Sequence, residues 1–189
     1  MKRIAILASG EGTNAENLIN YFRTSNSGRV VLVLTNKPGA GVIARARSLE
    51  VETVVFDREQ FYKTGSIVAL LKERGIDFIV LAGFLWLVPS LLLASYAGRV
   101  INIHPALLPK YGGKGMYGNR VHQAVIENGD SRSGITIHHV NQVYDEGAVI
   151  FQASCPVEKD DTPESLASKI HSLEHAHFPV VVEELLNKL

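Results

Sequence analysis

The stretch "KRIAILASGEGTNAENLINYF", residues 2–22, decides the fold that the sequence predicts. It opens with an apolar run, which is typical of a strand covered on both faces of a parallel sheet. A glycine turn follows, and apolar residues then recur at helical spacing at Ala15, Leu18, Ile19 and Phe22. A buried strand, a glycine turn and an amphipathic helix in this order predict the start of an α/β fold.

The same alternation continues to the end of the chain. Further strands are predicted at 29–35, 52–56, 78–82, 99–104, 133–140 and 148–157, and helices at 42–49, 66–74, 91–96, 120–128 and from Thr162 onward. We therefore expect a Rossmann-like three-layer sandwich with a mostly parallel sheet. The last two strands have a hairpin-like link, which predicts an antiparallel C-terminal part. Pro179 is expected to kink or break the last helix.

Length and composition limit the classes of protein that fit. The chain has 189 residues, which suits one domain spanning 1–189. Lysine plus arginine and aspartate plus glutamate both number 19, so no overall charge attracts nucleic acid. Cys155 is the only cysteine, which excludes an intrachain disulfide and fits a reducing cytoplasm. We expect a cytoplasmic monomer or homodimer that binds small molecules.

The segment "FIVLAGFLWLVPSLLLA", residues 78–94, is the one stretch that could be taken for a membrane span. It is uncharged, and its length is near the lower limit for a span. Gly83, Pro89 and Ser90 interrupt it. These breaks favour a buried strand, a loop and the start of a helix, with no membrane partner.

The motif "GEGTNA", residues 10–15, lies between the first strand and the first helix. Free N–H groups at a helix start attract anions, and glycine lets a ligand approach the backbone. The spacing also fits a dinucleotide fingerprint, which expects an acidic residue after the second strand. That strand ends in Thr35-Asn36-Lys37 instead. A single phosphate is favoured, while a dinucleotide site and a plain tight turn remain alternatives.

The stretch "VINIHPALLPKYGG", residues 100–113, carries the second candidate site. Alternate strand residues share a face, so Asn102 and His104 point the same way, and Pro105 ends the strand. An amide can donate to an oxyanion, and an imidazole can move a proton near neutral pH. A structural role for this pair is an equal alternative. Asp145, in the turn "VYDEG", would raise the pKa of His104 if the two met, but turn aspartates are commonly solvated.

The other histidines give weaker signals. His138 and His139 are adjacent in a strand and cannot bind one ligand together. His171, His175 and His177 surround Glu174 in the last helix, but no recognisable metal signature is completed. These residues are expected to line a polar pocket without a metal. The sequence also lacks the G-x-S-x-G motif of serine hydrolases, which argues against a nucleophilic serine.

Taken together, the motifs "ILASGEGTN", "VLAGFLWLV", "INIHPALLPKYGG", "HQAVIENGD" and "SGITIHHVNQVYDEGAVI" resemble the folate-dependent formyltransferases over nearly the whole chain. The "SGEGTN" loop narrows the resemblance to the phosphoribosylglycinamide formyltransferase branch. The resemblance implies transfer of a formyl group from 10-formyltetrahydrofolate to the amine of glycinamide ribonucleotide, a step of purine synthesis. In this reaction Asn102 and protonated His104 would stabilise an oxyanion, with Asp145 holding His104 charged and oriented.

The resemblance also implies the binding roles. The N-terminal part would bind the phosphorylated substrate through Gly12, Thr13 and Asn14, with Glu174 of the last helix also contacting it. The C-terminal part would contribute most to folate binding, with residues 140–145 closing over the folate. The residues expected to contact the folate are Arg58, Leu85, Trp86, Leu87, Val88, Asn102, Val140 and Asn141. Trp86 departs from the pattern, because an arginine often stands there.

Two other kinds of protein are alternatives to a phosphoribosylglycinamide formyltransferase. Formyltetrahydrofolate hydrolase and methionyl-tRNA formyltransferase use the same chemistry, but normally carry an added domain for which this chain has no room. A nucleotide-binding module without catalysis would use "GEGTNA" alone and would leave Asn102, His104 and Asp145 unexplained.

Overall fold

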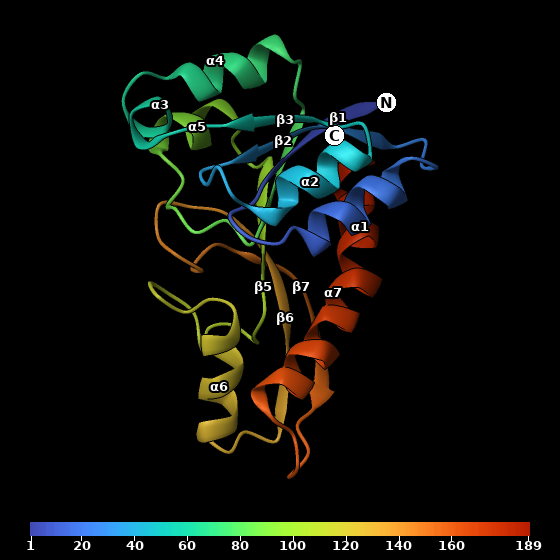
Figure 1. The fold of residues 1–189 in the computed structure, drawn as a ribbon, viewed down its shortest axis with the longest axis vertical. Coiled ribbons are helices and arrows are strands. Elements are labelled where there is room, and N and C mark those ends of the chain that lie inside the picture. The colour runs from blue at the N-terminus through green and yellow to red at the C-terminus, as the bar shows by residue number, and fades with distance from the viewer.

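The computed structural model describes residues 1–189 and contains a seven-stranded sheet, with strand order β3-β2-β1-β4-β5-β6-β7 (Figure 1). The strands are β1 (Lys2–Leu7), β2 (Gly28–Thr35), β3 (Glu52–Val55), β4 (Phe78–Ala82), β5 (Val100–His104), β6 (Arg132–His139) and β7 (Val149–Pro156). Strands β1 to β5 pair in parallel, whereas β6 pairs antiparallel with both β5 and β7. The predicted α/β sandwich with an antiparallel C-terminal part is confirmed.

Helices cover both faces of the sheet (Figure 1). They are α1 (Thr13–Phe22), α2 (Gly41–Ser48), α3 (Arg58–Tyr62), α4 (Ser66–Glu73), α5 (Ser90–Ser95), α6 (Asn119–Glu127) and α7 (Pro163–Leu186). Helix α3 was not predicted from the sequence. Its signal is a capping box, in which Asp57 accepts a hydrogen bond from the Gln60 N–H and the Gln60 side chain accepts one from the Asp57 N–H.

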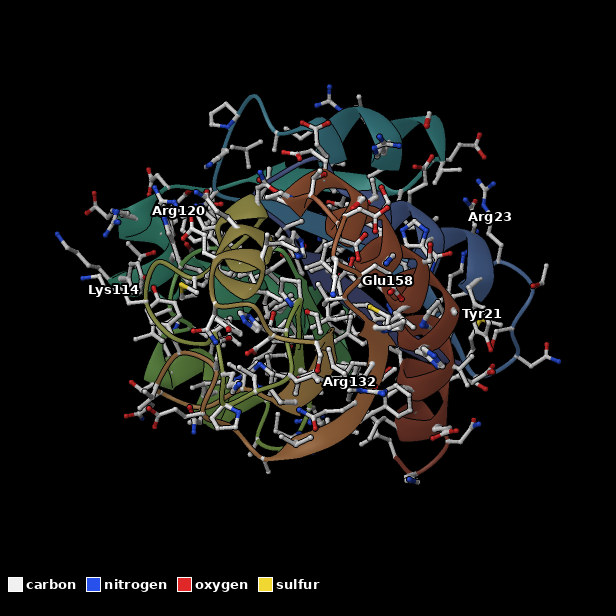
Figure 2. The ribbon with its side chains drawn as sticks, turned by 90° about the horizontal axis from the view of Figure 1, so that it is seen from below. Tyr21, Arg23, Lys114, Arg120, Arg132 and Glu158 are labelled. Carbon is white, nitrogen blue, oxygen red and sulfur yellow. The ribbon has the colours of Figure 1, made fainter.

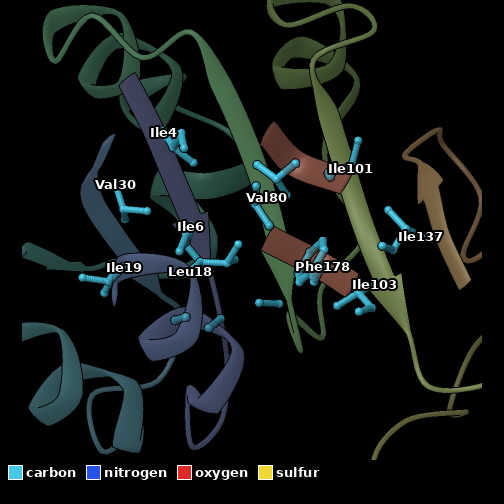
Figure 3. Close-up of a cluster of buried hydrophobic side chains, with 14 of the residues drawn as sticks. Ile4, Ile6, Leu18, Ile19, Val30, Val80, Ile101, Ile103, Ile137 and Phe178 are labelled. Atoms are coloured by element: carbon cyan, nitrogen blue, oxygen red, sulfur yellow. The ribbon is translucent and has the colours of Figure 1, made fainter. Parts of the chain in front are cut away.

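Two apolar clusters form the core, one on each side of the sheet. Ile4 and Ile6 of β1 belong to the cluster shared with α1, α2 and α7, which also contains Phe178 (Figure 3). Ala5 and Leu7 point to the other side and pack in the cluster shared with α3, α4 and α5. Because β1 is buried on both faces, the position of its carboxyl end is firmly fixed.

The long helix α7 decides one half of the prediction that Pro179 would kink or break it: the helix is not broken there. It continues from Pro163 to Leu186, and Pro179 lies inside it without breaking it. Proline removes one backbone hydrogen bond from a helix. Here Pro179 is buried with its neighbours Phe178, Val181 and Val182, so that apolar burial offsets this loss.

The apolar segment 78–94 forms β4, a loop and most of α5, as its glycine and proline predicted. None of the helices combines the length and the apolar character that crossing a membrane would require. The strand β4 instead lies in the middle of the sheet, fully buried between β1 and β5. The carboxyl ends of β1, β4 and β5 therefore meet at one edge of the sheet, where ligands bind in folds of this kind.

Candidate active site

A cavity of about 700 Å³ opens at this edge of the sheet. Such a volume suits a small-molecule site. It is lined by residues 10–14 after β1, 82–85 after β4, 102–105 at the end of β5, 113–118 and 144–145, together with residues of α6 and α7. Both motifs that the sequence singled out thus face the same cavity.

The turn after β1 is shaped by Gly12. Its φ of 79° lies in the left-handed region, and it occupies the N-cap position of α1. A Cβ atom there would lie 2.5 Å from Cβ of Val42, so only glycine fits. The turn leaves the first N–H groups of α1 at the cavity, where they can bind an anion.

Glu174 reaches this turn from α7. Nδ2 of Asn14 donates a hydrogen bond to Oε2 of Glu174 at 2.9 Å. The Glu174 side chain is buried, and burial raises the pKa of its carboxyl group. Oδ1 of Asn14 is buried without a partner. Because a buried polar atom without a partner is costly, this oxygen is suited to a ligand that brings a donor.

Ser9 has a structural role next to this turn. Its Oγ donates to Oδ1 of Asn36 at 2.6 Å and accepts from the N–H of Leu85 at 3.0 Å. Ser9 therefore joins the ends of β1 and β2 to the segment after β4. Its hydroxyl is thus paired with an amide oxygen and a backbone N–H.

The end of β5 brings three predicted residues together. Nδ1 of His104 lies 3.6 Å from Oδ2 of Asp145, and Nε2 of His104 lies 2.7 Å from the carbonyl oxygen of Tyr111. Asn102 contacts His138, with 3.1 Å between Nδ2 and Nε2. His138 Nε2 is also 3.6 Å from Oδ1 of Asp145. Asn102, His104 and Asp145 thus form one group, with His138 between the first and the last.

The pKa values in this group depend on burial as well as on charge. Asp145 raises the pKa of His104, as the sequence predicted, and so does the Tyr111 carbonyl, but burial lowers it more, so the net shift is downward. That Asp145 keeps His104 protonated stays a prediction, which this downward shift does not favour. Burial alone would raise the pKa of Asp145, but His138, His104 and the Gly113 N–H together lower it, which favours the carboxylate.

Two further histidines at the site, His138 and His122, were not predicted from the sequence as site residues. His138 could be placed only by the β5–β6 register, which sets it opposite Asn102. His122 lies on α6, lines the cavity and is buried, with no partner for Nδ1. Burial, with smaller contributions from His171 and His104, lowers the pKa of His122 to about 4. Two cationic side chains also line the cavity, Arg120 of the same helix and Lys114. Both lie on the side of the molecule opposite Tyr21 and Arg23 (Figure 2).

The residues expected to bind folate lie beside the group of Asn102 and Asp145. A second hollow of about 50 Å³ is lined by both, with Trp86, Leu87, Val88, Val140 and Asn141. The Arg58 guanidinium stacks 4.9 Å from the centre of the Trp86 ring, at the outer side. Leu85 lines the larger cavity instead. The structure brings these predicted residues into one neighbourhood.

Tyr144 lines both hollows, as do Phe84, Asn102 and Asp145. The Tyr144 hydroxyl donates to the carbonyl oxygen of Leu85 at 3.4 Å. This contact ties the loop after β6 to the segment after β4. The smaller hollow is well below the volume of a typical ligand site.

The amide, imidazole and carboxylate at the carboxyl edge of this α/β sheet can together stabilise an oxyanion and move a proton, as a group-transfer enzyme requires. The chain matches the formyl transferase family over residues 2–182, and it belongs to that family.

Particular relatives narrow the comparison to phosphoribosylglycinamide formyltransferases. The Bacillus subtilis enzyme of this name is 32% identical over 98% of this chain and 95% of its own length. The chloroplastic enzyme of Arabidopsis thaliana is 40% identical over 96% of this chain, which spans 64% of that relative. The crystal structure of the Bacillus halodurans enzyme superposes with a TM-score of 0.88 at 38% identity, covering 99% of this chain and 96% of that one.

Proposed function

We propose that this enzyme transfers the formyl group of 10-formyltetrahydrofolate to the amine of glycinamide ribonucleotide. The products are formylglycinamide ribonucleotide and tetrahydrofolate, as in de novo purine synthesis. One observation carries the proposal: a single cavity joins the start of α1, which is suited to an anion, to the buried His104 and its half-buried neighbours Asn102 and Asp145. The names of the relatives support the choice of substrate.

The N-terminal part of the single domain would bind the ribonucleotide. Gly12, Thr13 and Asn14 offer the N–H groups of α1 to its phosphate. Glu174 would accept a hydrogen bond from the same substrate, next to the unpartnered oxygen of Asn14. This arrangement would put the substrate amine toward the end of β5, where Asn102 and His104 lie.

The C-terminal part would bind the folate. Leu85, Trp86, Leu87 and Val88 would hold the pterin from one side, and Val140, Asn141 and Asn102 from the other. Arg58 would contact the distal part of the folate from its position over Trp86. A pterin needs more room than the smaller hollow offers, so its binding would displace Tyr144 from Leu85.

The chemistry follows from the charges of the site. The lowered pKa of His104 makes it a neutral base when the substrates arrive. As the amine attacks the formyl carbon, Nδ1 of His104 would take the amine proton, and Asp145 would stabilise the imidazolium. The amide of Asn102 would donate to the oxyanion. The proton would then pass to the leaving folate nitrogen.

The experiment that tests the proposal measures tetrahydrofolate release with and without glycinamide ribonucleotide. Release that requires the ribonucleotide is the expected result. Release in water alone would show a formyltetrahydrofolate hydrolase instead. A folded protein that releases nothing would fit the nucleotide-binding module. We place the reaction in the cytoplasm, in a monomer or homodimer with no metal, nucleic acid or membrane partner.

A further inference from the structure

One short turn after β5 contacts both ionisable groups of the proposed reaction through its backbone. The carbonyl oxygen of Tyr111 lies 2.7 Å from Nε2 of His104. Two residues later, the N–H of Gly113 donates to Oδ2 of Asp145 at 2.9 Å. The position of this turn therefore sets the position of the imidazole and the carboxylate together.

The turn has a conformation that the backbone does not favour by itself. Tyr111 has a φ of 57°, in the left-handed region, and Asp145 has a φ of 59°. A non-glycine residue there costs on the order of 1–3 kcal/mol and persists only where the surrounding structure holds it. Something other than local preference must therefore keep the Tyr111 carbonyl on His104.

Asp130 provides this restraint. The hydroxyl of Tyr111 donates to Oδ2 of Asp130 at 3.0 Å. The same carboxylate is held by Nζ of Lys110 at 3.0 Å and by Nδ2 of Asn128 at 2.9 Å. Tyr111 and Asp130 line a separate cavity of about 320 Å³, which shares no residue with the large one. Their side chains therefore act from outside the substrate cavity.

We propose that Tyr111 is a positioning residue: its hydrogen bond to Asp130 holds the carbonyl that fixes the tautomer of His104. A carbonyl oxygen only accepts, so Nε2 of His104 must carry a proton to donate to it. Nδ1 is then the nitrogen left to take and release a proton, and it is the one that faces Asp145. The inference rests on the proposed formyl transfer, in which Nδ1 moves the proton.

Tyr111→Phe tests this inference, because it removes the hydroxyl and keeps the backbone. We expect kcat to fall about ten-fold with little change in KM, the scale of losing a ~1.4 kcal/mol preference between tautomers. The Tyr111 carbonyl raises the pKa of His104, so a weaker contact lowers it further. The acid limb of the pH–rate profile should then move to lower pH.

A matched control exists elsewhere in the chain. Tyr21 of α1 also donates its hydroxyl to a carboxylate, that of Glu183, at 2.6 Å and outside the cavity. Tyr21→Phe should leave kcat and the pH profile unchanged. Asp130→Asn keeps an acceptor for Tyr111 and should retain most activity, whereas Asp130→Ala should match Tyr111→Phe. Wild-type kcat and an unmoved profile in Tyr111→Phe would overturn the inference.

A second readout separates this inference from the proposed function. The ¹⁵N chemical shifts of the His104 ring report its tautomer whether or not formyl transfer occurs. We expect a proton on Nε2 in the wild-type protein, and a mixture of tautomers in Tyr111→Phe but not in Tyr21→Phe. A proton on Nδ1 of neutral wild-type His104 would overturn the inference. Absence of formyl transfer by the wild-type protein would overturn the proposed function alone.

Discussion

The turns that follow β1 and β5 lie at the same edge of the sheet, yet they are held by different forces. The turn after β1 depends on the missing side chain of Gly12, which lets the backbone pass close to Val42. The turn after β5 contains Tyr111 in a left-handed conformation and depends on hydrogen bonds from side chains far along the chain. Shape fixes the first turn, and polar partners fix the second.

Thr136 of β6 shows how the second turn is held. It is fully buried, its Oγ1 donates to the carbonyl oxygen of Ala106 at 2.7 Å, and it accepts from the N–H of Leu108 at 3.0 Å. The first turn presents N–H groups to a ligand and needs no titratable group of its own. The second turn positions an imidazole and a carboxylate, so its geometry and its protonation are coupled. Binding and chemistry are thus supported by independent means.

The largest expected effect comes from removing the group that the second turn positions. His104→Ala should lower kcat by roughly 10³-fold, because both proton transfer and charge stabilisation are lost. The free energy of unfolding should change far less than the activation free energy of the reaction. The reason is that burial makes the charged form of the imidazole unfavourable, so the ring adds little stability. Steady-state kinetics and chemical denaturation check this.

His177→Ala is the matched control for His104→Ala. The His177 ring packs on the Phe151 ring, with 5.0 Å between the ring centres, and His177 does not line the cavity. The kcat of this variant should stay near the wild-type value. Near-normal turnover in His104→Ala would show that this histidine takes no part in the reaction. The second turn would then have no catalytic role to distinguish it from the first.

The next effect tests whether shape holds the first turn. Gly12→Ala should destabilise the protein by about 3 kcal/mol, from left-handed strain and from overlap with Val42. It should also raise the KM for the phosphorylated substrate with little effect on the KM for folate.

Gly10→Ala serves as the control for this variant. A Cβ at Gly10 would meet nothing within 4 Å, so its unfolding free energy should change by less than about 0.5 kcal/mol. Equal effects of the two substitutions in urea denaturation would show that the close approach to Val42 does not define the turn.

The contrast between the turns also explains what could be read from the sequence. The glycine spacing of residues 10–15 and the helical period after it describe the first turn almost completely, because its cause is local. Asn102 and His104 could be placed on one face for the same reason. The links to His138 and Asp130 could not, because they depend on strand register and on contacts between distant segments. Whether Asp145 meets His104 also needed the structure.

The same distinction applies to two expectations about single residues. Asp145 raises the pKa of His104 as its charge predicted, but the depth of burial decides the direction of the net shift. The effect of Pro179 was predicted from its own chemistry, but packing of α7 on the sheet decides whether the helix continues. In both cases tertiary burial outweighs a rule that holds for an isolated segment.

A smaller effect tests whether polar partners hold the second turn. Thr136→Val keeps the shape of the side chain but leaves the N–H of Leu108 without its acceptor and the carbonyl oxygen of Ala106 without the donor from Thr136. We expect a loss of about 2 kcal/mol in stability, together with a lower kcat. Thr136→Ser keeps the hydroxyl and should be milder on both measures. If valine and serine behaved alike in denaturation and kinetics, hydrogen bonding would not be what fixes this turn.

The smallest expected effect is a loss of stability at low pH. It comes from His122, which lines the cavity beside the second turn. The pKa of His122 is lowered from 6.5 to about 4, so the unfolded chain binds a proton there that the folded chain does not. Stability from this group is present above pH 6.5 and falls as pH falls toward 4. Between about pH 8 and about pH 5.5 the loss from His122 should be roughly 1.4 kcal/mol.

His122→Gln isolates this contribution, because glutamine does not titrate. The pH dependence of the unfolding free energy should be shallower in the variant by that amount, and the remaining slope should come from other groups such as His104. An identical slope in His122→Gln would mean that His122 is protonated as readily in the folded protein as in the unfolded chain. The cavity beside the second turn would then be more open to water than its buried histidines indicate.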